Sequence, residues 1–126
     1  QELSSGRLTL VSSPGPEIAA CDIHFICVGT PQLAGSDEAD LTYVMAAGTE
    51  LASHLRPESV VVGKSTVPVG TAAKLRTTMS EVAGFDVRLA WNPEFLREGT
   101  ALEDSLAPDR IVIGSRRRHY RSVIKN

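Results

Sequence analysis

The fold is decided by an apolar run and the polar motif after it, which read Val87-Arg88-Leu89-Ala90-Trp91 and then Asn92-Pro93-Glu94-Phe95-Leu96-Arg97-Glu98-Gly99. The apolar run predicts a buried strand, so the motif begins where that strand ends. Glu94 and Glu98 are four residues apart and share a face if this segment is helical. The motif is therefore a candidate site, although its Asn-Pro start also fits an ordinary capped surface helix.

Two other segments repeat this arrangement. Residues 22–29 (DIHFICVG) predict a strand followed by Thr30-Pro31, and residues 59–64 (SVVVGK) predict one followed by Ser65-Thr66-Val67-Pro68. Helices expected at 40–55 and 70–83 separate the three strands, which is typical of βαβ units and a parallel sheet. The carboxyl ends of parallel strands line one edge of a sheet, where ligands bind in such folds. The sequence thus predicts one crevice formed by three loops.

The remaining pattern supports the same architecture. Asp40 predicts the start of the first long helix, and Gly84 predicts the end of the second. Residues 23–28 are apolar at nearly every position, which predicts a strand buried on both faces, with His24 as a satisfied packing residue. Shorter elements are expected at 8–11 (strand), 16–20 (one helical turn), 100–106 (helix) and 111–114 (strand).

Four motifs, in order, resemble the UDP-glucose/GDP-mannose dehydrogenase family: residues 25–31 (FICVGTP), 64–71 (KSTVPVGT), 92–99 (NPEFLREG) and 108–114 (PDRIVIG). The resemblance implies a Rossmann-like, doubly wound parallel α/β sheet with NAD as cofactor. No Gly-x-Gly-x-x-Gly, the loop that holds a dinucleotide pyrophosphate, occurs in the sequence. The family carries that loop upstream of the matched segment. We therefore expect a partial NAD-binding domain over residues 1–115 that lacks its first βαβ unit, and a basic tail over 116–126 that is disordered or a truncated helix.

The resemblance also implies the reaction of the intact enzyme. Enzymes of the family oxidise the primary alcohol of a nucleotide sugar to a carboxylate, through a thioester on a cysteine that lies downstream of the matched segment. UDP-glucose is the expected substrate, and GDP-mannose or an N-acetylated UDP-sugar is the alternative. Because neither Cys21 nor Cys27 sits in the motif of that cysteine, we expect this chain to be inactive by itself.

Individual residues acquire expected roles in the same way. Glu94 matches the family's catalytic glutamate, which activates water with help from Thr66. The implied cofactor contacts are Val28, Gly29, Thr30, Pro31, Gln32, Ser65, Thr66, Val67 and Glu98. The implied substrate contacts are Glu94, Phe95, Leu96, Arg97 and Glu98. Lys64 is interpreted as ion-paired or solvated.

Charge and cysteine content restrict the other function classes. All 15 acidic residues precede Ser115, where only eight basic residues occur, so this body carries a net charge of −7 and the tail holds five basic residues. An acidic body disfavours nucleic acid as a partner and leaves the basic tail as a remote alternative. No apolar run reaches membrane-spanning length, and two cysteines supply neither a disulfide framework nor a metal site. We expect a reduced, cytoplasmic protein that is a homo-oligomer when intact. A non-catalytic module that pairs through an exposed sheet edge is the alternative.

Overall fold

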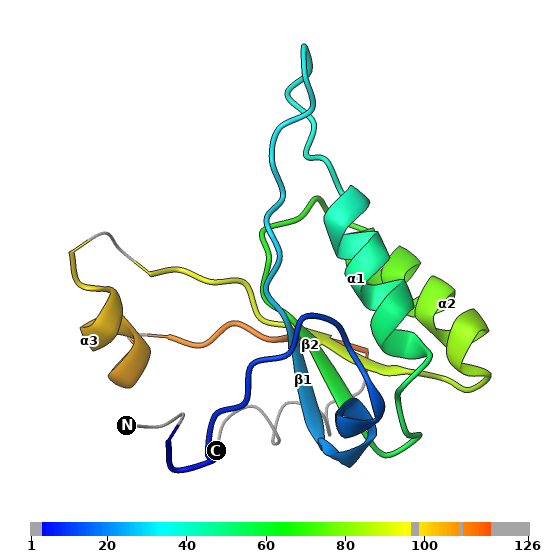
Figure 1. The fold of residues 1–126 in the computed structure, drawn as a ribbon. Coiled ribbons are helices and arrows are strands. Elements are labelled where there is room, and N and C mark those ends of the chain that lie inside the picture. Colours follow the sequence, from blue (N-terminus) through cyan, green and yellow to red (C-terminus); the bar gives the residue numbers. More distant parts are fainter. Residues whose placement is uncertain (1–3, 97–98, 109, 117–126) are drawn as a thin grey trace.

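The computed structural model describes residues 4–96, 99–108 and 110–116 (Figure 1). A four-stranded sheet with strand order β1-β2-β3-β4 forms its centre. The first three strands are parallel, and the short last strand runs antiparallel to β3. In chain order the elements are η1 (Pro16–Ala20), β1 (Ile23–Ile26), α1 (Thr42–Ala52), β2 (Val60–Gly63), α2 (Thr71–Ala83), β3 (Arg88–Trp91), α3 (Ala101–Leu106) and β4 (Gly114–Ser115).

The two long helices lie side by side on one face of the sheet, as Figure 1 shows. α1 connects β1 to β2 and α2 connects β2 to β3, which is the predicted pair of βαβ units. The helices approach closely because Gly48 of α1 has no side chain where Leu75 of α2 lies. Between helices and sheet lies the core, whose buried members are Ile26, Val44, Leu51, Ala52, Val61, Leu75, Met79, Val87, Leu89 and Trp91.

The second long helix ends where it was predicted to, whereas the predicted limits of the first, 40–55, are wrong: α1 spans Thr42–Ala52, and its N-cap position is Leu41 rather than Asp40. The Asp40 carboxylate accepts a hydrogen bond from the Thr42 N–H at 2.9 Å, two residues ahead, where α1 begins. Hydrogen bonds from Thr42 to the charged form lower the pKa of Asp40. At the C-terminus of α2, Gly84 ends the helix with a left-handed φ of 76°, and its N–H donates to the Ser80 carbonyl. The helix predicted at 70–83 is therefore confirmed.

The prediction that the first strand is buried on both faces is wrong. In β1, His24 and Ile26 are buried against the helices, whereas Ile23 and Phe25 on the other face are 39% and 56% exposed. On that other face, the side chains of the central strands are buried, as Val62 and Ala90 show, whereas those of the edge strand β1 are exposed. β1 is the edge strand, and it ends at Ile26, so Cys27 is also exposed.

His24 packs as predicted but is not fully satisfied. Its side chain is 6% exposed, and its Nε2 finds no hydrogen-bond partner among the described residues. Loss of water around the ring, and then the positive charge of Arg56, lower the pKa of His24. The neutral imidazole is therefore the form that the fold favours.

Two short strands differ from their predictions. Residues 8–11 form no strand, and Leu8, Leu10 and Val11 are exposed, because β-propensity without a neighbouring strand leaves backbone groups unpaired. The strand predicted at 111–114 begins only at Gly114, and its antiparallel direction departs from the parallel arrangement expected of the sheet. Residues 117–126 lie outside the described residues, so the boundary at 115 stays a prediction. In the described part of the chain, no helix has the length and apolarity needed to cross a bilayer.

Candidate functional site

The three predicted loops leave the sheet at the same edge. Past the ends of the strands, the Lys64 N–H donates to the Ile26 carbonyl at 2.9 Å, and the Asn92 N–H donates to the Gly63 carbonyl at 2.8 Å. The parallel hydrogen-bond ladder therefore continues for one residue beyond β2 and β3. This places the segments after β1, β2 and β3 in adjacent positions, as the sequence predicted.

Hydroxyl groups join the first two loops. Ser65 Oγ donates to the Val28 carbonyl at 2.5 Å, and Thr30 Oγ1 donates to the Thr66 carbonyl at 2.8 Å. These reciprocal bonds fix the two loops that carry most of the expected cofactor contacts. The Thr66 side chain is exposed, and within the described residues its own hydroxyl takes no hydrogen bond. That hydroxyl is thus available to a ligand or a water molecule.

Trp91 stabilises the loop after β2 by a hydrogen bond to Ser65, a role that the sequence pattern did not predict. Its indole ring lies against Gly63, its direct neighbour in the sheet, where any Cβ would overlap the ring. Its Nε1–H donates to the Ser65 carbonyl at 2.9 Å, and the side chain is only 7% exposed. A buried tryptophan usually finds a partner for its N–H, and here that partner precedes Thr66. The Gly63–Trp91 pairing is a property of register, which a pattern of apolar residues does not reveal.

No helix begins at Asn92, so the interpretation of this motif as a capped surface helix is wrong. Residues 92–96 have no regular secondary structure, and α3 begins only at Ala101. Instead of capping a helix, the Asn92 amide accepts from Lys64 Nζ at 3.1 Å and donates to the Val112 carbonyl at 2.9 Å. Lys64 is therefore half-buried and bonded to a neutral amide, and it forms no ion pair with a described residue.

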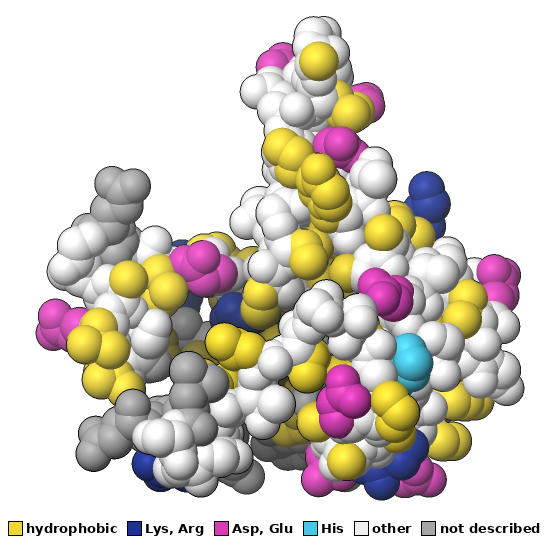
Figure 2. All heavy atoms as spheres, in the orientation of Figure 1, with side chains coloured by type: hydrophobic (Ala, Val, Ile, Leu, Met, Phe, Trp, Pro, Cys, Tyr) yellow, Lys and Arg dark blue, Asp and Glu magenta, His cyan; other side chains and the backbone are white. Residues whose placement is uncertain are grey.

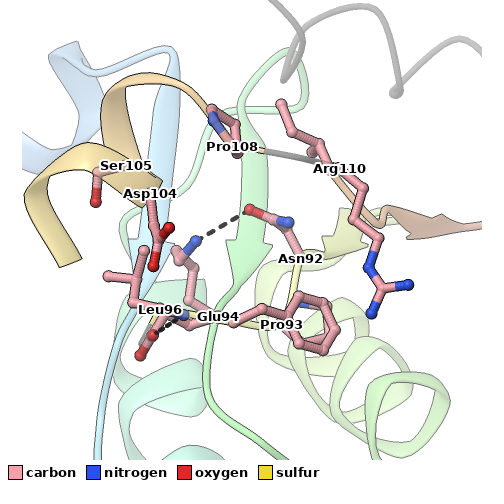
Figure 3. A pocket seen from close by; sticks show the side chains of 11 residues that line it. Asn92, Pro93, Glu94, Leu96, Asp104, Ser105, Pro108 and Arg110 are labelled. Carbon is pink, nitrogen blue, oxygen red and sulfur yellow. Dashed lines mark hydrogen bonds between the residues drawn. The ribbon is translucent and has the colours of Figure 1, made fainter. Parts of the chain in front are cut away.

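A cavity of about 630 Å³ opens between this segment, α3 and the stretch before β4 (Figure 3). Glu94 lies in its wall, and its Oε1 accepts from the Leu96 N–H at 2.7 Å. Arg110 lies over the Phe95 ring, with 5.7 Å from its guanidinium carbon to the ring centre, a second contact that the sequence did not predict. The cavity is lined by Lys64, Asn92, Pro93, Glu94, Phe95, Leu96, Asp104, Ser105, Pro108, Arg110 and Ile111.

The structure brings some of the predicted site residues together and separates others. Glu94, Phe95 and Leu96 share the cavity, whereas Thr66 is absent from its lining. Gln32 points elsewhere: its Nε2 donates to Asp37 Oδ1 at 3.0 Å, in the loop that projects at the top of Figure 1. Arg97 and Glu98 lie outside the described residues, as does Asp109.

Comparison with known proteins gives a consistent result. The model of the UDP-glucose/GDP-mannose dehydrogenase family, NAD binding domain, matches residues 1–126. UDP-glucose 6-dehydrogenase of Rhizobium meliloti (strain 1021) is 50% identical over 113 residues, which are 89% of this chain and 26% of that protein. The chain thus spans about a quarter of the length of the curated relatives it matches.

Solved structures agree with the sequence matches. A UDP-glucose dehydrogenase from the hyperthermophilic archaeon Pyrobaculum islandicum is similar with a TM-score of 0.83 and 44% identity, over 97% of this chain and 29% of that one. A GDP-mannose dehydrogenase from Pseudomonas aeruginosa, solved as a ternary complex, has a TM-score of 0.78 and 31% identity, over 86% of this chain and 26% of that one. The predicted Rossmann-like fold is confirmed by these similarities.

Proposed function

The chain belongs to the UDP-glucose/GDP-mannose dehydrogenase family, whose NAD binding domain it matches, and from this we propose that it forms part of an enzyme that oxidises UDP-glucose to UDP-glucuronate. NAD is the cofactor of this domain, and when bound it would supply the acceptor for the hydride. The observation that carries the proposal is the convergence of three loops at one sheet edge, with Glu94 in the wall of an adjoining cavity. Such an edge is where open α/β sheets bind their ligands.

The proposed residue roles are those that the family resemblance implies, and the position and chemistry of several residues support them. We propose that residues 28–32 and 65–67 contact NAD, with Glu98 as a further contact, and that residues 94–98 contact the nucleotide sugar. Gln32 would make its contact only after giving up its hydrogen bond to Asp37. Thr66 offers a free hydroxyl on a loop that Ser65, Thr30 and Trp91 hold in place. Glu94 offers an exposed carboxylate that would position or activate water, with Thr66 holding that water or a substrate oxygen.

The cofactor roles can be tested by NMR on the chain itself. NAD should shift the amide signals of Thr30 and Thr66, and nicotinamide mononucleotide should shift the same signals, because these loops lie at the carboxyl edge of the sheet. Adenosine monophosphate should leave them unchanged. Since the sequence has no glycine-rich pyrophosphate loop, we expect a dissociation constant in the ~1 mM range or weaker. A constant near ~10 μM, or shifts caused by the adenine half alone, would contradict this assignment.

The catalytic role of Glu94 needs a complete enzyme. Replacing the matching segment of the Rhizobium meliloti relative by this chain gives a chimaera in which Glu94→Gln can be made. We expect kcat to fall by about 10²–10⁴ with KM nearly unchanged, because proton transfer to or from water is lost while substrate contacts remain. Mass spectrometry should then detect a covalent intermediate on the host's cysteine. Thr77→Ala, on the outer side of α2, is the matched control.

Identity values favour UDP-glucose over other nucleotide sugars. The matched proteins named for UDP-glucose are 50% and 44% identical to this chain, whereas the one named for GDP-mannose is 31% identical. Assaying the chimaera with both nucleotide sugars does not decide between them, because the host supplies most of the sugar pocket. The substrate is decided by assaying the natural full-length protein with UDP-glucose, GDP-mannose and N-acetylated UDP-sugars.

One observation favours a second function, that of an interaction or oligomerisation module. β1 is an edge strand with Ile23 and Phe25 exposed. Within the described residues no strand pairs with its outer side, so its outer backbone groups and its apolar face can receive a partner strand. Analytical ultracentrifugation over a range of concentrations tests this function without reference to NAD. A homo-oligomeric, cytoplasmic enzyme stays our proposal for the intact protein, and the free thiols of Cys21 and Cys27 fit a reducing compartment.

A further inference from the structure

Residues 92–96 carry Glu94 but have no helix or strand of their own to hold them. Among the described residues, every hydrogen bond between this segment and its neighbours is made by Asn92. Its N–H donates to the Gly63 carbonyl, its Nδ2 donates to the Val112 carbonyl, and its Oδ1 accepts from Lys64 Nζ. In the described part of the chain, the one other hydrogen bond of the segment is internal, from the Leu96 N–H to Glu94.

We propose that Asn92 is the positioning residue of the Glu94 segment. Its amide joins the residue after β2, Lys64, to the stretch before β4 at Val112; we call these three residues the amide clasp. Lys64 and Asn92 both line the cavity, and the dashed line at Asn92 in Figure 3 marks the hydrogen bond between them. The clasp therefore fixes where Glu94 stands relative to the carboxyl edge of the sheet.

The chemistry of the clasp requires an amide. Its two partners are a cation, which can only donate, and a carbonyl, which can only accept. A carboxylate at position 92 would still accept from Lys64 but would face the Val112 carbonyl with a second acceptor. An apolar side chain would serve neither partner. Because Asn92 is neutral, it also orients the Lys64 ammonium without cancelling its charge, so a positive charge remains beside the cavity that holds Glu94.

This inference deepens the proposed function, since a positioned Glu94 matters only if Glu94 acts on water or substrate. The clasp itself is testable on this chain without any ligand. Failure of the NAD or chimaera experiments would leave the clasp standing, and failure of the clasp experiments would leave those results unchanged.

Lysine labelling tests the half of the clasp that involves Lys64. Limited acetylation followed by mass spectrometry compares Lys64 with Lys74, an exposed lysine on α2 in the same molecule. Asn92→Ala should raise the Lys64/Lys74 labelling ratio about tenfold, because the ammonium loses its acceptor and rotates into solvent. Asn92→Asp should leave the ratio at or below the wild-type value, because its carboxylate keeps that acceptor. Equal ratios in wild type and Asn92→Ala would overturn the proposal.

Hydrogen exchange tests the half that involves Val112. Asn92→Asp and Asn92→Ala should both speed amide exchange in β4 about tenfold, because they lose the donor to Val112 two residues before that strand. The Leu96 amide, which Glu94 holds, should also exchange faster in Asn92→Ala. Lys64→Met should change β4 exchange less than about twofold, since the Val112 bond remains.

The split between the variants distinguishes positioning from general stability. A merely structural residue would give the same loss for Asn92→Asp and Asn92→Ala in both readouts. With the clasp, Asn92→Ala changes both readouts, whereas Asn92→Asp speeds β4 exchange and leaves the Lys64 labelling ratio low. Thr77→Ala, whose hydroxyl bonds only within α2, should change neither. If Asn92→Ala fails to fold, Asn92→Asp decides alone: unchanged β4 exchange in that variant would overturn the proposal.

Discussion

The two faces of β1 both carry apolar side chains, but one face is buried and the other is exposed. Ile26 lies under the helices and is buried, whereas Phe25, the preceding residue, is a large apolar side chain that is 56% exposed on the other face. Figure 2 shows apolar side chains on the surface of the molecule. The two faces differ in exposure because α1 and α2 both pack on the same face of the sheet and, among the described residues, leave the opposite face of β1 without a helix. An apolar strand therefore indicates how much surface is available for burial, but not which partner buries it.

The largest effect is expected on the covered face. Leu75→Ala removes a side chain with no exposed area from the contact between α1 and α2, and it should lower the free energy of unfolding by about 3–5 kcal/mol. Val82→Ala, on the same helix but 45% exposed, should cost less than about 1 kcal/mol. Urea denaturation monitored by circular dichroism measures both. Similar losses for the two variants would mean that the helix pair is not the core of this chain.

The open face should promote self-association. We expect the chain to form dimers or larger species as its concentration rises, because an unpaired edge strand with apolar neighbours is a template for pairing. Phe25→Lys should weaken this association by about 1.5–3 kcal/mol, or at least tenfold. Tyr43→Lys replaces an equally exposed aromatic on α1 and serves as the control. A compact monomer at all concentrations, measured by size-exclusion chromatography with light scattering, would contradict the prediction.

A smaller effect on stability is expected at the Gly63–Trp91 contact, which joins the helix-covered face of the sheet to the loop after β2. Gly63→Ala places a methyl group in the Trp91 ring, which must move and release the Ser65 carbonyl, at a cost of about 1–3 kcal/mol. Trp91 is the single tryptophan, so its fluorescence should shift to longer wavelength as the indole becomes hydrated. Gly29→Ala, whose Cβ would meet no atom within 4 Å, should leave the emission unchanged. Unshifted emission in Gly63→Ala would show that the ring has room to move without leaving the sheet.

The smallest effect concerns pH. Burial lowers the pKa of His24 below its usual value near 6.5, so the folded state prefers the neutral ring. The unfolded state therefore binds this proton first as pH falls, and stability present above pH ~6.5 is lost below it. Urea midpoints at pH 7 and pH 5 measure the loss. In His24→Phe the difference between the two midpoints should shrink, and an unchanged difference would remove His24 as its cause.

Much of the site follows from local sequence, and part of it does not. The loop positions were predictable because a proline or polar run after an apolar strand has local causes, and parallel strands bring their carboxyl ends together. That Asn92 caps no helix was not predictable, because the same amide can satisfy a helix terminus or two distant partners. Lys64 and Val112 lie 28 and 20 residues away from it in the chain, and nothing in the local pattern marks them. Arg110 over Phe95 is a further long-range contact of this kind.

By itself, the sequence determined the βαβ order, the limits of α2, the Asp40 and Gly84 signals and the family, because these depend on residues a few positions apart or on ordered motifs. Only the tertiary structure decided which face of β1 is covered, that β4 runs antiparallel, that Trp91 lies across Gly63, and that Asn92 joins Lys64 to Val112. The physical reason is that burial and pairing are properties of two surfaces, and a single stretch of sequence specifies only one of them.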